Sequence, residues 1–89
     1  MPKIVRRGDP GSHGGEISEG AATVFAEKKA VARIGDIYDC PIHGPNEIVE
    51  GSFTVFAEKK RVVRDGDKAA CGAAMISRVK SVFADDGGG

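Results

Sequence analysis

The stretches ISEGAATVFAEKKAVARIGD (residues 17–36) and IVEGSFTVFAEKKRVVRDGD (residues 48–67) are two copies of one unit. Aligned at a period of 31 residues, they share 14 identical residues among 20 pairs, including the TVFAEKK segment and the final Gly-Asp. Repeats at such a period indicate a supersecondary unit that is stacked on its neighbours or rotated against them. The fold is therefore expected to be built from copies of this unit.

Each unit contains two short runs of β-branched and aromatic residues. TVFA is followed by AVAR or RVVR, and the two runs are joined across EKK. Runs of this composition favour strands, so each unit is predicted to be a β-hairpin with strands of about five residues. The Gly-Asp pair that ends the second run is typical of a turn or strand exit.

A third copy of the unit is divided between the two ends of the chain. SVFAD (residues 81–85) resembles TVFAE, and KIVRRGD (residues 3–9) resembles the run that ends in Gly-Asp. Placed end to end, these segments rebuild the hairpin with its turn cut open. The sequence thus predicts an all-β fold of short β-hairpins with pseudo-three-fold repeats and with its two ends close together. A short helix over residues 73–80 competes with strand or turn there, because Ala, Met, Arg and Lys favour helices.

Length and charge restrict the class of protein. At 89 residues and 9.3 kDa, residues 1–89 are expected to form one small domain without an extension domain. The 13 basic and 13 acidic residues give a formal net charge of zero, which provides no sustained attraction for nucleic acid or anionic lipid. Because no apolar run is long enough for a signal peptide or membrane anchor, synthesis in the cytoplasm is expected.

Every Cys and His falls at a related position in the repeat. Four residues after the Asp of each of three Gly-Asp pairs stands a Cys or a His, and CPIH (residues 40–43) adds one more His. Two thiolates and two imidazoles suit a tetrahedral structural Zn²⁺, and nearby glycines let the backbone segments converge on an apex. The candidate ligands are His13, Cys40, His43 and Cys71.

Other interpretations of these residues compete with the metal site. CPIH alone is weak evidence, a disulfide between Cys40 and Cys71 is disfavoured in a reducing cytoplasm, and His13 alone is typical of a surface loop. A closed set of four protein ligands leaves no coordination position for substrate, which argues against an enzyme. The aspartates of the Gly-Asp pairs are more typical of turns than of acid or base catalysis.

The segments RRGDPGSHGG, TVFAEKKAVARIGDIYDCPIHG and GSFTVFAEKKRVVRDGDKAACG resemble the PAAR-repeat proteins over nearly the whole chain. These proteins cap the spikes of type VI secretion systems and of related contractile phage tails. The resemblance implies a small cone of β-strands with an apical zinc, and it carries the family's zinc ligands to His13, Cys40, His43 and Cys71.

The chain departs from the family pattern at three points. Ala30 and Arg61 stand where the family commonly has a proline, and Glu-Lys-Lys stands where the turn is often Asn-Gly. Two His and two Cys replace the usual three His and one Cys, and sulfur in place of imidazole still suits zinc.

The resemblance also implies a function and its partners. The base of the cone is expected to sit on a trimeric valine-glycine repeat spike protein, one copy per spike, because three related units offer similar edges to a three-fold partner. The tip would help to pierce target envelopes, with effectors attached non-covalently, and would leave the cell on the injection apparatus. The EKK turns are expected at or near the base, either as solvated loops or in contact with the spike. Strand alternation separates each Val from the following Phe without deciding which one faces the core. These residues are Val24, Phe25, Val55, Phe56, Val82 and Phe83.

The main alternative is a small zinc-ribbon-like module that binds nucleic acid or protein. It uses the same residue types, but zinc ribbons normally have two paired knuckles and this sequence has one Cys-x-x-His pair. Zero net charge and few aromatic residues also argue against nucleic-acid binding.

Overall fold

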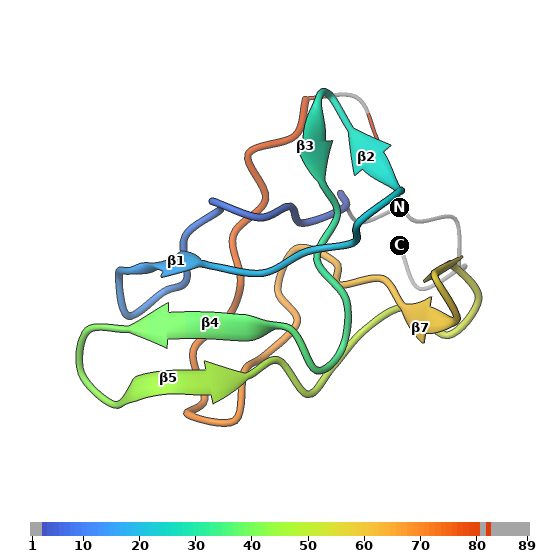
Figure 1. Cartoon of the computed structure of the whole chain (residues 1–89). Coiled ribbons are helices and arrows are strands. Elements are labelled where there is room, and N and C mark those ends of the chain that lie inside the picture. The colour runs from blue at the N-terminus through green and yellow to red at the C-terminus, as the bar shows by residue number, and fades with distance from the viewer. Residues whose placement is uncertain (1–2, 81, 83–89) are drawn as a thin grey trace.

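The repeat units fold into the hairpins that their sequence predicts. The computed structural model describes residues 3–80 and 82, and its strands are short and antiparallel (Figure 1). In one hairpin β2 (Phe25–Ala26) pairs with β3 (Lys29–Ala30), and in the next β6 (Phe56–Ala57) pairs with β7 (Lys60–Arg61). A three-stranded sheet in the order β1 (Glu16–Ile17), β4 (Ile37–Cys40), β5 (Gly44–Glu47) joins them.

The hairpin strands are two residues long, so the prediction of about five residues was wrong. Each run divides its hydrogen bonds between its own hairpin and a neighbouring unit. The N–H of Val31 donates to the carbonyl of Val24 in its own hairpin, but the N–H of Ala32 donates to Val5 in another unit. A ladder that changes partner after one residue cannot extend into a longer strand.

Three backbone hydrogen bonds close a ring at the centre of the molecule. The N–H of Val5 donates to Val63, that of Val63 donates to Ala32, and that of Ala32 donates to Val5, each at 2.9 Å. All three residues are fully buried. One residue from each unit thus meets at a pseudo-three-fold axis, as the repeat predicts.

Residues near the two ends of the described chain complete the third unit. The N–H of Ile4 donates to the carbonyl of Val82 at 3.0 Å, just as Val31 bonds to Val24 and Val62 bonds to Val55. The prediction of a divided unit is confirmed at this pair, and the two ends of the described chain lie side by side. The rest of SVFAD lies outside the described residues.

Strand alternation around the ring separates two layers of core. Ile4, Val31 and Val62 point into one cluster, whereas the next residues along the chain point into the other. Val24, Val55 and Val82 pack against the first cluster. Phe25 and Phe56 are 57% and 55% exposed, so the valines face inward and these two phenylalanines face outward.

The Arg-x-Gly-Asp segments form three equivalent turns. In each, the backbone N–H of the arginine donates to its aspartate at 2.8 Å, and the glycine has a φ between 91° and 94°. That conformation favours glycine because a Cβ is strained there. The equivalent pairs are Arg6 with Asp9, Arg33 with Asp36, and Arg64 with Asp67.

Residues 73–80 contain no helix, and Ala74 and Met75 take part in β-bridges instead. The preference for strand or turn over helix is therefore confirmed there. No helix suited to crossing a membrane occurs in the part of the chain that the structure describes.

Candidate metal centre

The three equivalent units differ in the length of the loop that follows Gly-Asp. In each unit a residue beyond this loop donates its N–H back to the aspartate carbonyl: Ile17 to Asp9, Ile48 to Asp36, and Met75 to Asp67. From these numbers the interval is eight residues in the first and third units and twelve in the second. The four additional residues lengthen the hairpin of β4 and β5.

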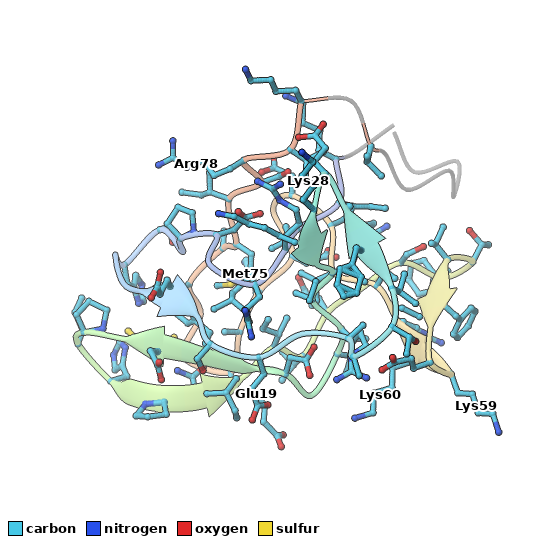
Figure 2. All side chains as sticks on the ribbon, turned by 45° about the horizontal axis from the view of Figure 1, so that its top comes forward. Glu19, Lys28, Lys59, Lys60, Met75 and Arg78 are labelled. Atoms are coloured by element: carbon cyan, nitrogen blue, oxygen red, sulfur yellow. The ribbon has the colours of Figure 1, made fainter. Side chains whose placement is uncertain are left out.

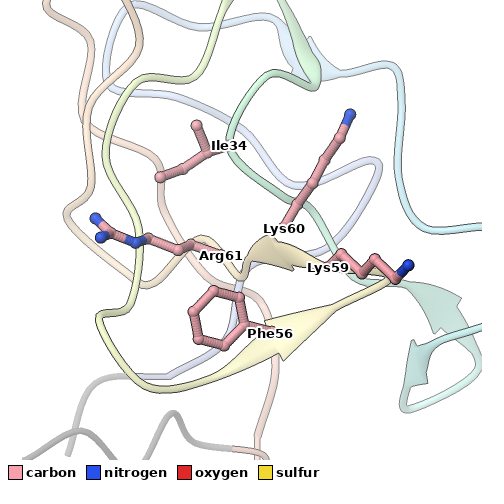
Figure 3. Close-up of a pocket in the computed structure, with 5 residues that line it drawn as sticks. All are labelled: Ile34, Phe56, Lys59, Lys60 and Arg61. Carbon is pink, nitrogen blue, oxygen red and sulfur yellow. The ribbon is translucent and has the colours of Figure 1, made fainter.

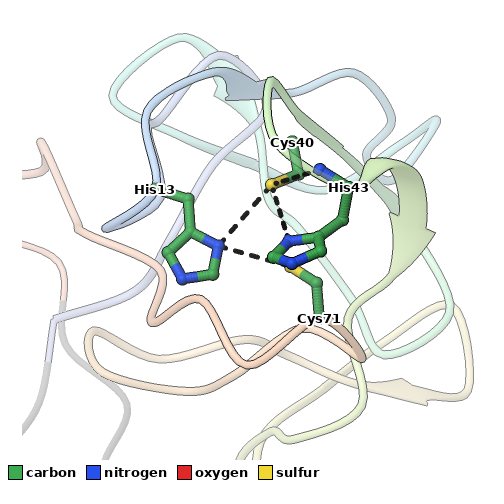
Figure 4. A group of neighbouring side chains, drawn as sticks. All are labelled: His13, Cys40, His43 and Cys71. Atoms are coloured by element: carbon green, nitrogen blue, oxygen red, sulfur yellow. Dashed lines mark hydrogen bonds between the residues drawn. The ribbon is translucent and has the colours of Figure 1, made fainter.

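The longer loop supplies the fourth candidate ligand. His13, Cys40 and Cys71 hold the same place in three units, whereas His43 lies in the turn between β4 and β5. The loops bring all four residues together, so each residue predicted as a ligand lies in one cluster (Figure 4). Their potential ligand atoms all lie within 4.8 Å of one another.

The distances between these atoms suit one tetrahedral ion. Cys40 Sγ lies 3.6 Å from His13 Nδ1 and 3.5 Å from His43 Nδ1, and Cys71 Sγ lies 3.9 Å from His13 Nδ1. A tetrahedral Zn²⁺ with ordinary bond lengths separates its sulfur and nitrogen ligands by about 3.6 Å. The group can hold a metal ion such as zinc. Both cysteines are free thiols, so the alternative of a disulfide is not formed.

The surroundings of Cys40 favour its thiolate. Desolvation raises its pKa, but hydrogen bonds from the backbone N–H groups of His43 and Ile42, together with the imidazoles of His13 and His43, lower that pKa to about 6. The N–H of His43 lies 3.4 Å from Cys40 Sγ. Since the thiolate is the form that binds metals, this loop prepares Cys40 as a ligand near neutral pH.

Tyr38 fixes the loop that carries His13, and the sequence reasoning missed it. Its side chain is fully buried, and its hydroxyl donates a hydrogen bond to the carbonyl of Gly14. A Cβ on Gly11 would lie 2.5 Å from the Tyr38 ring, and one on Gly15 would lie 1.9 Å from the carbonyl oxygen of Asp39. In the sequence, the feature that could have indicated this role is that Tyr38 is the single tyrosine in a chain with 13 glycines.

The aspartates of the Gly-Asp turns are structural. Asp9, Asp36 and Asp67 are at most 6% exposed, and each accepts a hydrogen bond from the backbone N–H of its arginine. The guanidinium groups of Arg33 and Arg64 lie 2.9 Å from their partners. These carboxylates are occupied by turn contacts, as predicted, and are not arranged as acid and base groups around the cluster.

The loops around the cluster carry no charged residue. Residues 10–15, 40–46 and 69–77 contain no Lys, Arg, Asp or Glu, although 29% of the chain is charged. Ile42, beside the candidate ligands, is 67% exposed. The cluster therefore lies at an uncharged end of the molecule, away from the turns of the β2–β3 and β6–β7 hairpins (Figure 1).

Comparison with protein families gives one finding for this chain. The model of the PAAR motif family matches residues 7–77, which include all four residues of the cluster. A search of curated proteins found no matching relative.

Proposed function

This chain belongs to the PAAR motif family, and from that membership we propose that it caps the end of a trimeric spike in a type VI secretion system or contractile phage-like injection machine. The family is one of structural spike-tip components, and the chain is not an enzyme. Its partner in this proposal is a valine-glycine repeat spike protein, with one chain for each trimer.

The ring of hydrogen bonds among Val5, Ala32 and Val63 carries the proposal. It arranges three related units of one chain around a pseudo-three-fold axis. Each unit can then offer a similar surface to one subunit of a trimer. A single copy thereby matches a three-fold partner, and it also covers strand edges at the end of the spike that would otherwise be open to unwanted pairing.

The outward face of the hairpins is the proposed contact with the spike. Phe25 and Phe56 hold equivalent positions, and both are more than half exposed. The valine before each packs inward, so the hairpins are anchored while the aromatic rings stay available. Lys28 and Lys59 are exposed in the turns of the same hairpins, where they can add polar contacts, and Figure 2 shows Lys59 extending outward.

Zinc is the proposed ion at the other end, held by His13, Cys40, His43 and Cys71. When bound there it supplies structural cross-linking rather than catalysis, because four protein ligands complete its coordination. The four residues come from three loops, so one ion fastens all three units. In a chain with a thin core, this metal supplies part of the folding free energy.

Envelope piercing is consistent with the chemistry of the apex. Moving charged groups into an apolar layer is costly, and the three apical loops contain none. Ile42 presents an aliphatic side chain at this end. In the proposed role the chain leaves the cell at the front of the apparatus and contributes to delivery of effectors.

A zinc-ribbon-like module is less well supported. Such modules bring ligands from two knuckles, whereas three loops and one inserted turn bring them together here. The arrangement follows the pseudo-three-fold repeat, which a zinc ribbon does not require.

Native mass spectrometry of the chain mixed with a trimeric valine-glycine repeat protein tests the proposal. We expect one chain bound to each trimer. Phe25→Asp places a charge on the proposed contact and should weaken binding at least roughly tenfold. Ile42→Asp is the matched control, because it places the same charge at the opposite end and should leave spike binding unchanged.

Two results would overturn this assignment. Three chains bound to each trimer would show that the internal repeat does not match the spike's symmetry. Equal loss of binding in the Phe25 and Ile42 variants, with both variants folded, would place the contact elsewhere than on the hairpin face.

A further inference from the structure

One side of the molecule breaks the pseudo-three-fold symmetry. Arg7, Ile34 and Asp65 hold equivalent places, because the N–H of each donates to a carbonyl of a neighbouring unit at 2.7–2.9 Å. Two of these positions carry charges and the third carries an aliphatic side chain. The side that contains Ile34 therefore differs chemically from the other two.

One further position differs in the same direction. Phe53 lies five residues after Ile48, where the equivalent residues are Ala22 and Lys80. Val49 follows Ile48 directly and borders the same hollow as Phe53. Its equivalents are Ser18 and the exposed Ile76, so an apolar side chain stands at that position in two of the three units. Phe53 is 68% exposed and Val49 is 52% exposed, so apolar surface has accumulated on one side.

These residues line a groove formed by two adjoining hollows that share Ile34 and Arg61. Phe56, Lys59 and Lys60 border the first hollow (Figure 3). Val49 and Phe53 border the second. We call this surface the Ile34 groove.

Ile34 packs against the backbone at Gly51, and two arginine side chains contact the Phe53 ring. A Cβ on Gly51 would lie 2.9 Å from Ile34 Cγ1, so the absence of a side chain at Gly51 lets Ile34 pack closely against the backbone. The guanidinium groups of Arg61 and Arg64 lie 5.2 Å and 5.7 Å from the Phe53 ring centroid. Cation–π contacts of this kind hold the ring beside the groove.

The charge around the groove is mainly positive. Within residues 3–80 and 82, no acidic side chain forms an ion pair with Lys59, Lys60 or Arg61. Glu50 also borders the second hollow, but its carboxylate accepts a hydrogen bond from the backbone N–H of Lys68 at 3.0 Å. An occupant that complements this surface carries carboxylates beside apolar side chains.

We propose that the Ile34 groove binds an extended acidic segment of another polypeptide that carries aliphatic or aromatic side chains. A three-fold partner makes equivalent contacts with all three units, so a feature present on one side serves a partner without that symmetry. This inference goes beyond the proposed spike contact, because it rests on Ile34 and Phe53, which differ from their equivalents in the other units. Phe56 and Lys59 border both surfaces. The two hollows are shallow and open, and their apolar side chains and flanking cations suit a polypeptide segment that lies along the surface.

NMR titration of the ¹⁵N-labelled, zinc-loaded chain tests the proposal. The probe is a synthetic peptide in which Asp and Glu alternate with Leu and Phe, and the matched peptide replaces each acidic residue by Lys. We expect amide shifts around Ile34, residues 49–53 and residues 56–61 with the acidic peptide alone. The equivalent surface around Arg7 and Lys29 should remain unchanged.

Two substitutions make the groove resemble its equivalents. Ile34→Arg introduces the residue found at position 7, and Phe53→Ala introduces the residue found at position 22. Each should weaken peptide binding roughly tenfold while zinc content and Tm are retained. Ile76→Ser, which introduces the residue found at position 18 and lies on another side, should not change the affinity.

Four outcomes would overturn the proposal. They are no amide shifts with the acidic peptide, equal shifts around Arg7, self-association that Ile34→Arg abolishes, and flotation with phosphatidylglycerol vesicles in preference to peptide binding. The third result would assign the groove to a second copy of the chain, and the fourth would assign it to a lipid surface. None of these measurements contains the spike protein, so they are independent of the spike-binding test.

Discussion

At one position of the repeat, three equivalent units carry side chains of very different size. Tyr38 lies two residues after Asp36, and the residues at the same interval from Asp9 and Asp67 are Gly11 and Ala69. The Tyr38 ring fills the space beside Gly11, where even a Cβ would collide with it. Near a pseudo-three-fold axis three large side chains cannot all fit, so one large residue is combined with two small ones.

Removing one thiol from the cluster tests the metal site at the residue scale. Cys71→Ala should reduce zinc from about one ion per chain to nearly none. Because the ion joins three loops, Tm should fall by roughly 10 °C or more, to the value of wild-type protein treated with EDTA. Mass spectrometry under native and denaturing conditions and calorimetry measure the two effects.

Two companion variants separate ligand loss from general disturbance of the apex. Cys71→His keeps a ligand at the position and should retain zinc, whereas Ile42→Ala changes an exposed neighbour and should alter neither property. Unchanged zinc content in Cys71→Ala would contradict the assignment of Cys71 as a ligand.

At the scale of elements, the hairpin turns adopt a conformation that their residues do not favour. Glu27 and Lys28 have φ values of 48° and 72°, and Glu58 and Lys59 have values of 54° and 70°. Two consecutive positive φ angles are typical of type I′ turns, in which Asn and Gly are preferred. The contacts that Glu27 and Glu58 make with other units stabilise the turns despite this residue preference.

The contacts of the turn glutamates explain why their conformation persists. The Glu27 carboxylate lies 3.9 Å from the Arg6 guanidinium and accepts a hydrogen bond from the backbone N–H of Lys80. The Glu58 carboxylate lies 2.8 Å from Arg33 and accepts hydrogen bonds from Thr23. Each turn is thus joined to the preceding unit around the axis.

Lys28→Gly tests the strain in the turn without removing the glutamate contacts. Glycine adopts positive φ without the Cβ penalty, so the free energy of unfolding should rise by roughly 0.5–1 kcal/mol. For a domain of this size the increase in Tm should be roughly 2–8 °C by calorimetry.

Lys29→Gly is the matched control for that turn. Lys29 is the next residue along the chain, is also exposed, and lies in β3 rather than in the turn. Glycine in a strand loses more conformational freedom on folding, so this change should lower Tm. A decrease in Tm for both variants would contradict the interpretation of strain at Lys28.

At the scale of the whole molecule, the contacts between units depend on their cyclic arrangement around the axis more than on their order along the chain. The divided unit has the same hydrogen bond, from Ile4 to Val82, as the two continuous units. In the divided unit, the interval between Val82 and Ile4 therefore corresponds to the turn that joins the two strands in each of the other units. Opening another turn and closing the present one should preserve the same set of contacts.

A circular permutant tests this equivalence. The present ends are joined by a short flexible linker, and new ends are made between Glu27 and Lys28. We expect cooperative unfolding and about one bound zinc, since the ring and the ligand loops remain intact. Calorimetry and metal analysis measure both properties.

The control permutant has its new ends between Ile42 and His43. That break separates His43 from the turn that positions it, so zinc binding should be lost. If the first permutant fails to fold while the control permutant, which has the same linker, folds, the three units are not equivalent.

The sequence by itself determined the repeat, the hairpins, the divided third unit and the four residues of the cluster. These features follow from spacing along the chain: Arg-x-Gly-Asp turns form within four residues, and a fixed interval from each turn brings His13, Cys40 and Cys71 to one place. The family resemblance based on the same segments is confirmed by the match over residues 7–77.

Only the tertiary structure decided the strand lengths, the inward direction of the valines, the packing of Tyr38 on Gly11 and the difference among the three sides. Alternation along a strand distinguishes two faces, but the face that is buried depends on which other unit lies against it. That choice is made by contacts through space, such as the hydrogen bonds that close the ring at Val5, Ala32 and Val63. Local sequence does not encode these contacts, because each one joins residues from different units.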